Sequence, residues 1–166
     1  MTRVAVMFSG RILTLDEAAA FRATLRQEGR KVVATNGCFD LLHVGHLRYL
    51  TEARELGDFL WIGLNGDASV RELKGPDRPV VPEMDRAEVL AGWRMVDAVT
   101  IFPEVQATAF LRAVQPNVYV KGGDYRPETL DPSEGEVLRA CGARIEIVKL
   151  VPGRSTTSLV QKISKT

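Results

Sequence analysis

The two histidines of the chain, His43 and His46, lie three residues apart. Imidazoles at this spacing can lie on one face of the first turn of a helix and donate hydrogen bonds to an anion. Gly45 between them leaves room for a phosphate chain to approach the backbone. Two histidines near a helix start can also be capping or surface residues, so the spacing alone leaves both interpretations open.

The flanking residues favour the phosphate-binding interpretation. Residues 35–46 (TNGCFDLLHVGH) follow a short β-branched run at 31–35 that is typical of a strand, and they open a helix. A helix N-terminus presents free amides and a partial positive charge, which suits a phosphate. The stretch 153–157 (GRSTT) precedes the last predicted helix, where the hydroxyls and amides of Ser155, Thr156 and Thr157 form a second anion-binding end that faces the first. Ser155 can also act as a plain N-cap.

A further cation, Lys74, begins a polar stretch at residues 74–82 (KGPDRPVVP). Its three prolines and one glycine make it neither strand nor helix, so it is the best candidate for a mobile loop. We expect Lys74 to close over bound phosphates as a flexible point charge. A merely solvated loop charge is the alternative.

The elements around these groups must bring them together. Apolar runs of strand length occupy residues 31–35, 59–64, 96–102, 118–120 and 145–148. Helical patterns lie at residues 47–57, 83–93, 104–114, 134–140 and 155–163, and a capping box at Thr14 and Glu17 starts a helix that reaches about Gly29. Strands that alternate with helices predict an α/β fold: a Rossmann-like, doubly wound parallel five-stranded sheet with helices on both faces. Its ligand crevice lies at the carboxyl ends of the strands.

Composition excludes several other classes. The 166 residues are one domain's worth, with a helical extension at 1–30 before a core at 31–160. A net charge of +1, from 22 basic and 21 acidic residues, provides no broad surface for nucleic acid or an anionic membrane. We expect a cytoplasmic protein, because the apolar runs stay below the roughly 18 residues of a membrane span and no secretory signal precedes them. Cys38 and Cys141 are expected to be reduced packing thiols.

Residues 37–46 (GCFDLLHVGH) resemble the His-x-Gly-His signature of the cytidylyltransferase-like and class I aminoacyl-tRNA synthetase superfamily, and residues 153–157 resemble its second signature, G-x-S-T-T. Synthetases are much longer, which leaves the branch of small transferases. The resemblance implies a single nucleotidyltransferase domain over 1–166, with a catalytic core at 31–160 and His43, His46 and Lys74 as catalytic residues. It also implies nucleotide binding by Asn36, Gly37, Cys38, Phe39, Asp40, Gly45, Gly153, Arg154, Ser155, Thr156 and Thr157.

Within that branch, roughly residues 31–160 are similar to the D-glycero-β-D-manno-heptose 1-phosphate adenylyltransferases, most distinctly at 73–80 (LKGPDRPV) and 121–125 (KGGDY). This resemblance implies transfer of AMP from ATP to a sugar 1-phosphate, giving ADP-heptose for lipopolysaccharide and pyrophosphate. The candidates for contacts with substrate or phosphate are Asn65, Asp67, Arg78, Arg86, Lys121, Gly122, Gly123 and Asp124.

Two segments depart from the heptose pattern, at 102–108 (FPEVQAT) and 127–133 (PETLDPS), and both could touch the acceptor sugar. Nucleotide transfer is therefore better supported than the identity of the acceptor. The first alternative is a glycerol-3-phosphate cytidylyltransferase or another small transferase with a phosphate acceptor. The second is a nucleotide-binding module that has lost turnover.

In the implied reaction a phosphate oxygen attacks the α-phosphorus of the nucleotide. A phosphomonoester with a second pKa near 6 is already mostly a dianion at pH 7, so the reaction needs no strong general base. His43 and His46 would donate hydrogen bonds to the triphosphate, and pKa values near 6.5 would let adjacent phosphates hold both rings protonated.

The remaining roles concern charge around the triphosphate. Mg²⁺ is implied as its counter-ion, with no protein cage of its own. Asp40 either positions the loop after its strand or holds Mg²⁺ through water, and Arg86 either binds phosphate or sugar or pairs with Glu83 or Asp85. The resemblance implies a homodimer whose partners are ATP and a sugar phosphate, with no nucleic acid and no membrane.

Overall fold

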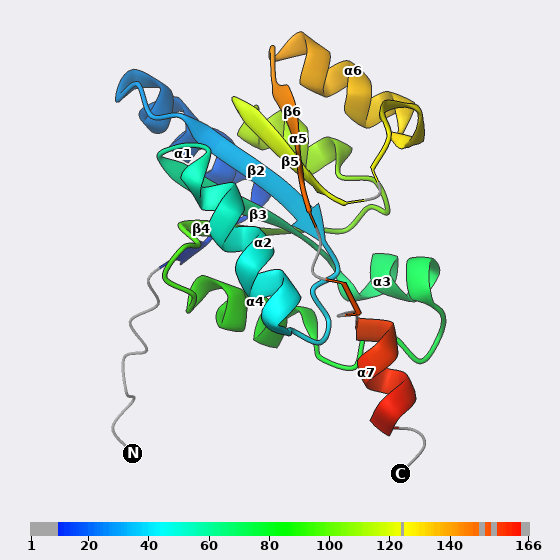
Figure 1. The fold of residues 1–166 in the computed structure, drawn as a ribbon. Helices are drawn as coiled ribbons and strands as arrows, with labels where there is room; N and C mark the ends of the chain where they lie inside the picture. The colour runs from blue at the N-terminus through cyan, green and yellow to red at the C-terminus, as the bar shows by residue number, and fades with distance from the viewer. Residues whose placement is uncertain (1–9, 124, 150–151, 154–155, 164–166) are drawn as a thin grey trace, which may run out of the picture.

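The computed structural model describes residues 10–123, 125–149, 152–153 and 156–163 (Figure 1). Strands and helices alternate along the chain, as the apolar runs predict. In chain order the elements are β1 (Arg11–Ile12), α1 (Leu15–Gln27), β2 (Val32–Gly37), α2 (Val44–Glu55), β3 (Phe59–Asn65), α3 (Asp67–Lys74), α4 (Glu83–Ala91), β4 (Ala98–Phe102), α5 (Thr108–Val114), β5 (Val118–Gly122), the 3₁₀ turn η1 (Pro127–Thr129), α6 (Pro132–Ala140), β6 (Arg144–Val148) and α7 (Thr156–Ile163).

All strands pair in parallel, in the order β1-β4-β3-β2-β5-β6. The predicted α/β class and its five strands are confirmed as β2 to β6. The described sheet has six strands rather than five, because Arg11 and Ile12 pair with Ala98 and Val99 at the edge. A strand of two residues is too short to show a period, so the pattern gave no sign of it.

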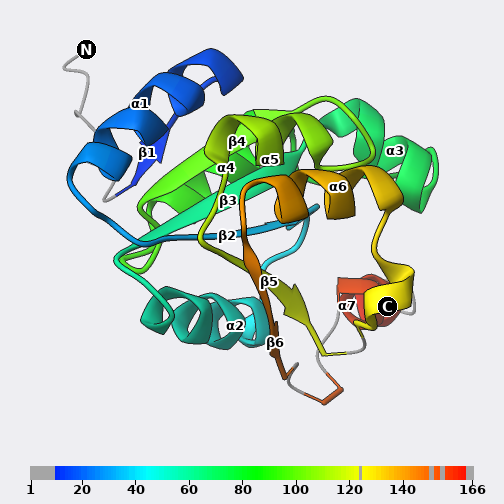
Figure 2. The ribbon, with the colours of Figure 1, turned by 90° about the horizontal axis from the view of Figure 1, so that it is seen from above.

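Helices cover both faces of the sheet, as Figures 1 and 2 show. On one face Val33 and Ile62 belong to a buried cluster with residues of α2 and α4, among them Leu50. On the other face Ala34 and Trp61 belong to a second cluster, which includes residues of α1, α5 and α6. Burial on both faces explains why the strands appear in the sequence as continuous apolar runs.

The first described residues pack against this core. The capping box predicted for α1 is present, since the Thr14 N–H donates to the Glu17 carboxylate at 2.8 Å and the Glu17 N–H donates to Thr14 Oγ1 at 3.2 Å. Arg22 is only 5% exposed, and its Nε donates to the carbonyl of Val114 at the end of α5 at 2.8 Å. These bonds hold α1 on the α5 side of the sheet.

The predicted start of the loop at Lys74 and the predicted start of the helix at residue 104 were both wrong. Residues 67–74 form helix α3, so Lys74 ends a helix and the irregular loop begins at Gly75. The Asp67 N–H at the first turn of α3 donates to the Glu83 carboxylate of α4 at 2.7 Å. Helix α5 begins at Thr108 rather than at 104, because the carbonyls of Glu104 and Val105 accept instead from the side chain of Asn65.

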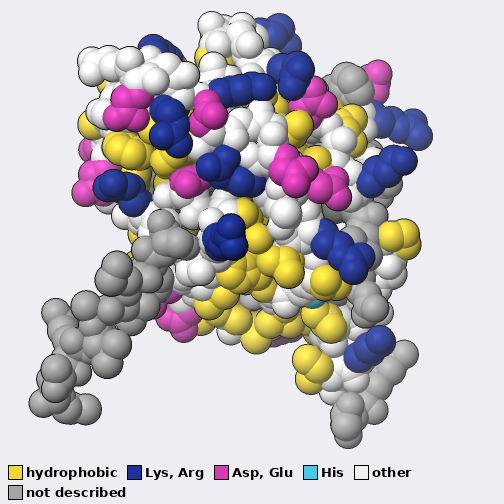
Figure 3. Space-filling view, turned by 60° about the vertical axis from the view of Figure 1, so that its left-hand side comes forward, with side chains coloured by type: hydrophobic (Ala, Val, Ile, Leu, Met, Phe, Trp, Pro, Cys, Tyr) yellow, Lys and Arg dark blue, Asp and Glu magenta, His cyan; other side chains and the backbone are white. Residues whose placement is uncertain are grey.

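The surface mixes charge with apolar side chains, and Figure 3 shows one face where apolar groups gather below a more charged region. Among the described residues, exposed apolar side chains include Val44 and Leu47 of α2 and Met84 and Val89 of α4. No helix within the described ranges is long and apolar enough to cross a membrane.

Candidate active site

A cavity of about 520 Å³ lies at the carboxyl ends of β2, β3 and β5. The chain runs from β2 outward through β3 to β4, and then returns to place β5 on the other side of β2, so the strand order reverses here. Ligands of doubly wound sheets bind at such a switch point. The lining residues are Asn36, Gly37, Cys38, Phe39, Asp40, His43, Gly45, His46, Tyr49, Asn65, Leu73, Lys74, Arg78, Val105, Gly122 and Thr156.

The two histidines meet at the N-terminus of α2. His43 is the N-cap, and its Nδ1 accepts the N–H of Gly45 at 3.1 Å, while Nδ1 of His46 accepts the N–H of His43 at 3.3 Å. Because each Nδ1 is an acceptor, a neutral ring carries its proton on Nε2. The backbone therefore fixes the tautomer of both rings and makes each Nε2 the donor atom.

His46 is neutral at pH 7 in the ligand-free protein. Burial is the main cause that lowers the pKa of His46 to about 4, and the nearby ring of His43 contributes in the same direction. The expected pKa near 6.5 is therefore wrong for His46. Its ring packs against Phe39, with the two ring centroids 5.4 Å apart.

The loop before α2 contains an unusual backbone conformation at Phe39, close to the two histidine rings. Phe39 has a φ of 45°, in the left-handed region that a non-glycine residue rarely adopts. Its side chain is 7% exposed and packs in the core, which holds the residue in that conformation. Cys38 beside it lines the cavity, where burial raises the pKa of its thiol.

Asp40 holds the loop that follows α3. Its carboxylate accepts the N–H groups of Val80 and Val81 at 2.9 Å and the Nε of Arg78 at 2.6 Å. Burial alone would raise the pKa of Asp40, but these amides and the guanidinium outweigh it and leave the pKa below its usual value. Of the two roles expected for Asp40, this geometry matches the positioning of a loop. The same bonds tie down residues 78–81 of the stretch that was expected to be mobile.

Arg86 and Asp67 lie behind the cavity wall. The Arg86 guanidinium is 1% exposed and donates to the carbonyls of Val81, Cys38 and Asn65 at 2.8, 2.6 and 2.9 Å. Its Nη2 also pairs with Asp67 Oδ1 at 2.6 Å. Neither residue lines the cavity, and the ion pair is with Asp67 rather than with Glu83 or Asp85. Arg86 thus fastens the ends of β2 and β3 to α4.

Lys74 and Thr156 reach the cavity from two other elements. Lys74 is exposed at the end of α3, and Thr156 begins α7. Thr156 Oγ1 donates to the carbonyl of Leu41 at 3.1 Å, which joins the start of α7 to the loop before α2. Gly153 has a φ of 70°. Arg154, Ser155 and Asp124 and the side chain of Thr157 lie outside the described residues.

The end of β5 also contributes to the cavity. Gly122 lines the cavity, and the Gly123 N–H donates to the carbonyl of Val148 at 2.9 Å. Lys121 Nζ lies 3.2 Å from Oδ1 of Asn36, which also accepts a hydrogen bond from the hydroxyl of Tyr119. Asn65 is 2% exposed, and its amide is used within the protein to hold residues 104–105.

Three lining residues were missed. Tyr49 follows His46 by three residues, so helical periodicity from the histidines could have found it. Leu73 directly precedes Lys74. Val105 lies in the segment 102–108 that could touch the acceptor sugar, but nothing in the sequence distinguishes it from the other residues there.

Carboxylates are scarce around this cavity. Within the part of the chain that the structure describes, no three His, Cys, Asp or Glu side chains are grouped to hold a metal ion. Asp40 lines the cavity, but its oxygens already accept bonds from Arg78 and two amides. Any metal ion here would depend on oxygens that a ligand supplies.

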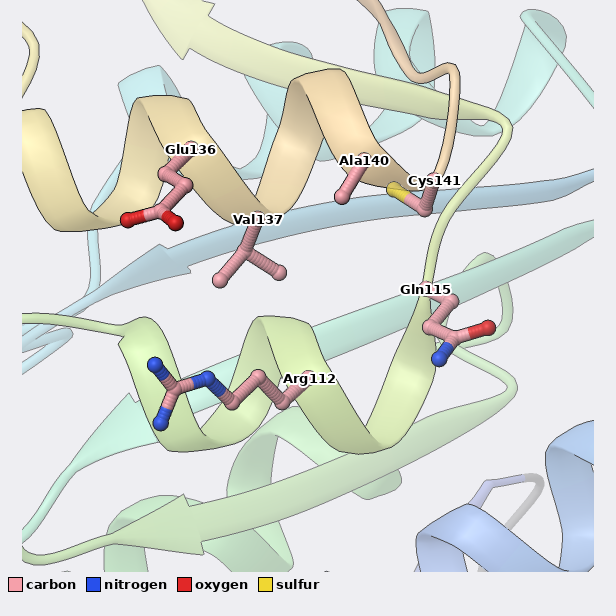
Figure 4. Close-up of a pocket in the computed structure, with 6 residues that line it drawn as sticks. All are labelled: Arg112, Gln115, Glu136, Val137, Ala140 and Cys141. Carbon is pink, nitrogen blue, oxygen red and sulfur yellow. The ribbon is translucent and has the colours of Figure 1, made fainter.

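A second cavity of about 270 Å³ lies between α5 and α6, away from the histidines (Figure 4). Its lining residues are Arg112, Gln115, Glu136, Val137, Ala140 and Cys141. The Cys141 sulfur lies 3.4 Å from the carbonyl of Leu138, and both cysteines are free thiols. Nothing in this cavity resembles the anion-binding arrangement at α2.

The histidines at a helix N-terminus and the cavity at the switch point of the sheet together form an arrangement in which α/β domains bind phosphorylated ligands. The chain belongs to the cytidylyltransferase-like family, whose model matches residues 34–159. It is similar to the bifunctional protein HldE of Geotalea uraniireducens, with 48% identity over 92% of this chain and 31% of that protein. Its identity to HldE of Syntrophotalea carbinolica is 49%, over 83% of this chain and 28% of the relative.

The chain thus spans about a third of the length of these curated relatives. Among solved structures, the lipopolysaccharide core biosynthesis protein of Thermoplasma volcanium matches with a TM-score of 0.61 and 27% identity, over 74% of this chain and 98% of that one. Pantoate-beta-alanine ligase of Francisella tularensis matches with a TM-score of 0.55 at 11% identity, over 95% of this chain and 78% of that one, which shows the fold alone.

Proposed function

We propose that this domain transfers AMP from ATP to a sugar 1-phosphate, with D-glycero-β-D-manno-heptose 1-phosphate as acceptor, and releases ADP-heptose and pyrophosphate. The acceptor follows from the resemblance at residues 73–80 and 121–125. Similarity to HldE, and to a protein described as acting in lipopolysaccharide core biosynthesis, supports the same assignment.

One observation carries the proposal: a single cavity is lined by His43, His46, Lys74 and Thr156. The histidines come from the start of α2, Lys74 from the end of α3 and Thr156 from the start of α7. The two imidazoles supply Nε2 donors, and the N-terminus of α2 adds its partial positive charge beneath them. Lys74 adds a full charge at the opening. This set suits the β- and γ-phosphates that leave as pyrophosphate.

The chemistry then needs alignment more than base catalysis. The attacking phosphate is already a dianion at pH 7, so these residues act by orienting the triphosphate and stabilising charge on the leaving pyrophosphate. A bound triphosphate would raise the pKa of His46 from about 4, because an adjacent anion favours the imidazolium. This role does not require a charged ring, because Nδ1 of His46 accepts the N–H of His43, and the neutral ring already donates from Nε2.

A divalent metal ion, Mg²⁺ with ATP, belongs to the proposal. The donor set fits an ion that arrives on the triphosphate, because the carboxylate of Asp40 is occupied by Arg78 and the loop amides. When bound, the ion would neutralise phosphate charge. We also propose that the protein is cytoplasmic and that it forms a homodimer, as the resemblance implies. Analytical ultracentrifugation would test whether the dimer forms.

The deciding experiment measures pyrophosphate release from ATP with heptose 1-phosphate, in parallel with CTP and glycerol 3-phosphate. We expect turnover with the first pair. Preference for the second pair would replace the proposal with a cytidylyltransferase. Binding of ATP without pyrophosphate release, across a panel of sugar phosphates, would indicate a module without turnover.

A further inference from the structure

A buried carboxylate lies beyond the cavity wall, on the side of the sheet away from the histidines. Glu134 belongs to the first turn of α6 and is 6% exposed. A carboxylate removed from water must be compensated by donors or cations. Its partners therefore indicate what it does.

Among the described residues, the Glu134 carboxylate has two partners, one in the loop before α5 and one at the end of β5. Oε1 accepts the N–H of Ala107, the N-cap of α5, at 2.7 Å. Oε2 lies 3.8 Å from Nζ of Lys121 at the end of β5. The side chain of Thr108 also lies 2.8 Å from Ser133, so two contacts join the start of α5 to the start of α6. The Thr108–Ser133 contact connects the two segments that depart from the heptose pattern, and Glu134 directly follows the second of them.

Lys121 links Glu134 to Asn36, a residue that lines the cavity. Its Nζ is 3.2 Å from Oδ1 of Asn36 and 4.8 Å from the ring centroid of Tyr119, whose hydroxyl donates to the same Oδ1. Burial raises the pKa of Tyr119 well above its usual value, so its hydroxyl stays a donor. Two donors on Oδ1 fix the orientation of the Asn36 carboxamide. Its NH₂ group can then donate hydrogen bonds to a ligand in the cavity that Asn36 lines.

The face of the sheet on which the Asn36 side chain lies indicates which of the two substrates it contacts. Side chains alternate along β2, so Asn36 shares the α5 and α6 side with Ala34, whereas the histidines belong to α2 on the opposite side. In-line transfer puts the attacking and leaving oxygens on opposite sides of the α-phosphorus. With pyrophosphate at the histidines, the acceptor approaches from the side of Asn36.

We propose that Glu134 is a positioning residue for the acceptor substrate, an inference that rests on the proposed function. Glu134 holds the ammonium of Lys121 against Asn36 and Tyr119 and away from the cavity. Asn36, which the resemblance implied as a nucleotide-binding residue, then presents neutral amide donors to the hydroxyl groups of the acceptor instead. The segments at 102–108 and 127–133 act on acceptor choice through this buried carboxylate.

The kinetic test compares Glu134→Gln in two backgrounds. The glutamine oxygen can still accept the Ala107 N–H, but its NH₂ group cannot hold an ammonium, so Lys121 is released toward the cavity. We expect KM for heptose 1-phosphate to rise about 10-fold, which corresponds to 1.4 kcal/mol, while KM for ATP and kcat change by less than about twofold. In a Lys121→Met background the same substitution should change KM for the acceptor by less than about twofold, because no ammonium remains to be held.

Glu136→Gln is the matched control, since Glu136 is exposed on the same helix and the chemical change is identical. Its KM values should equal those of the wild type. An equal effect of Glu134→Gln in both backgrounds would overturn the proposal, since Glu134 would then act without Lys121. An equal rise in KM for ATP and for the acceptor would overturn it as well.

A second measurement is independent of turnover. In the ligand-free protein, Glu134→Gln should shift the side-chain NH₂ resonances of Asn36 in a ¹⁵N-¹H spectrum, and Glu136→Gln should leave them in place. Unchanged Asn36 resonances would overturn the positioning role even if the enzyme is active. A wild-type protein without nucleotidyl transfer but with the expected shift would instead refute the proposed function alone.

Discussion

The rings of His43 and His46 lie with their centroids 4.0 Å apart, and the backbone N–H of His43 donates to Nδ1 of His46. One residue therefore orients the ring of the other, and both Nε2 donors depend on the same turn of backbone. The pair behaves as one unit fixed to the N-terminus of α2, which is what alignment of a triphosphate requires.

The first prediction concerns this pair. His43→Ala and His46→Ala should each reduce kcat by at least about 10²-fold, the usual scale for the loss of one oriented donor to a transition state. Because the two rings share one turn, the double variant should lose much less than the product of the two single effects. Steady-state pyrophosphate release measures all three. Arg48→Ala, an exposed change on the same helix, is the control, and near-normal rates in both single variants would exclude the proposed site.

The pKa of His46 predicts a pH dependence of stability. The pKa is about 4 in the folded chain and about 6.5 when unfolded, so the unfolded chain binds more protons between these values. Stability from the neutral ring is therefore complete above pH 6.5 and is lost as the pH falls toward 4, by up to about 3 kcal/mol.

Urea unfolding of the wild type and of His46→Asn at pH 7, 6 and 5 isolates this contribution, because all other titrating groups are common to both proteins. The free energy of unfolding of the wild type should fall relative to that of the variant as the pH decreases. Parallel curves would mean that His46 is not buried as a neutral ring.

Asp40→Asn tests the anchoring of the loop. The variant loses the charge that pairs with Arg78, and one of its polar atoms becomes a donor that faces the amides of Val80 and Val81. Removing one partner of a buried pair costs about 3–5 kcal/mol, so we expect a clear fall in the midpoint of thermal unfolding. KM for ATP should rise as well, since the loop joins Lys74 to the site. Asp77→Asn, an exposed aspartate in the same loop, is the control.

Much of the fold could be predicted because its strands are buried on both faces. The runs at 59–64 and 96–102 are continuous and apolar, and they appear as β3 and β4 with small shifts of boundary. The edge strand β1 and helix α3 escaped prediction for a physical reason. The first has two residues, and the second is a short polar helix whose first N–H is satisfied by Glu83 from a different element.

The site was predictable as a motif and only in part as a set of contacts. Most of residues 36–46 line the cavity, because one strand, one loop and one helix start hold them together. The charged candidates Arg78 and Arg86 were predicted from the resemblance as contacts to substrate or phosphate, with an ion pair as the alternative for Arg86. The structure uses both in ion pairs, with Asp40 and Asp67, and these pairings depend on residues 38 and 19 positions away. No local pattern encodes such partners.

Lys74→Ala should affect binding without affecting folding. Lys74 is exposed at the end of α3, so its removal leaves no buried group without a partner. We expect a loss of about 10-fold or more in kcat/KM for ATP and a weaker dependence of this ratio on salt, because a screened point charge is removed. Arg71→Ala removes an exposed charge from the same helix and should leave the ratio close to that of the wild type. An equal loss in both variants would mean that α3 contributes only general charge.

Arg86→Lys separates a structural role from a role in substrate binding. The guanidinium joins three carbonyls and Asp67 through three nitrogens in one plane, and an ammonium cannot reproduce this geometry. The substitution should therefore lower the free energy of unfolding by about 3 kcal/mol, the scale of a broken buried pair. At a temperature where the variant is folded, its KM for heptose 1-phosphate should stay within about threefold of wild type, since Arg86 does not line the cavity. A stable variant with a large rise in this KM would instead support the original prediction that Arg86 binds substrate or phosphate.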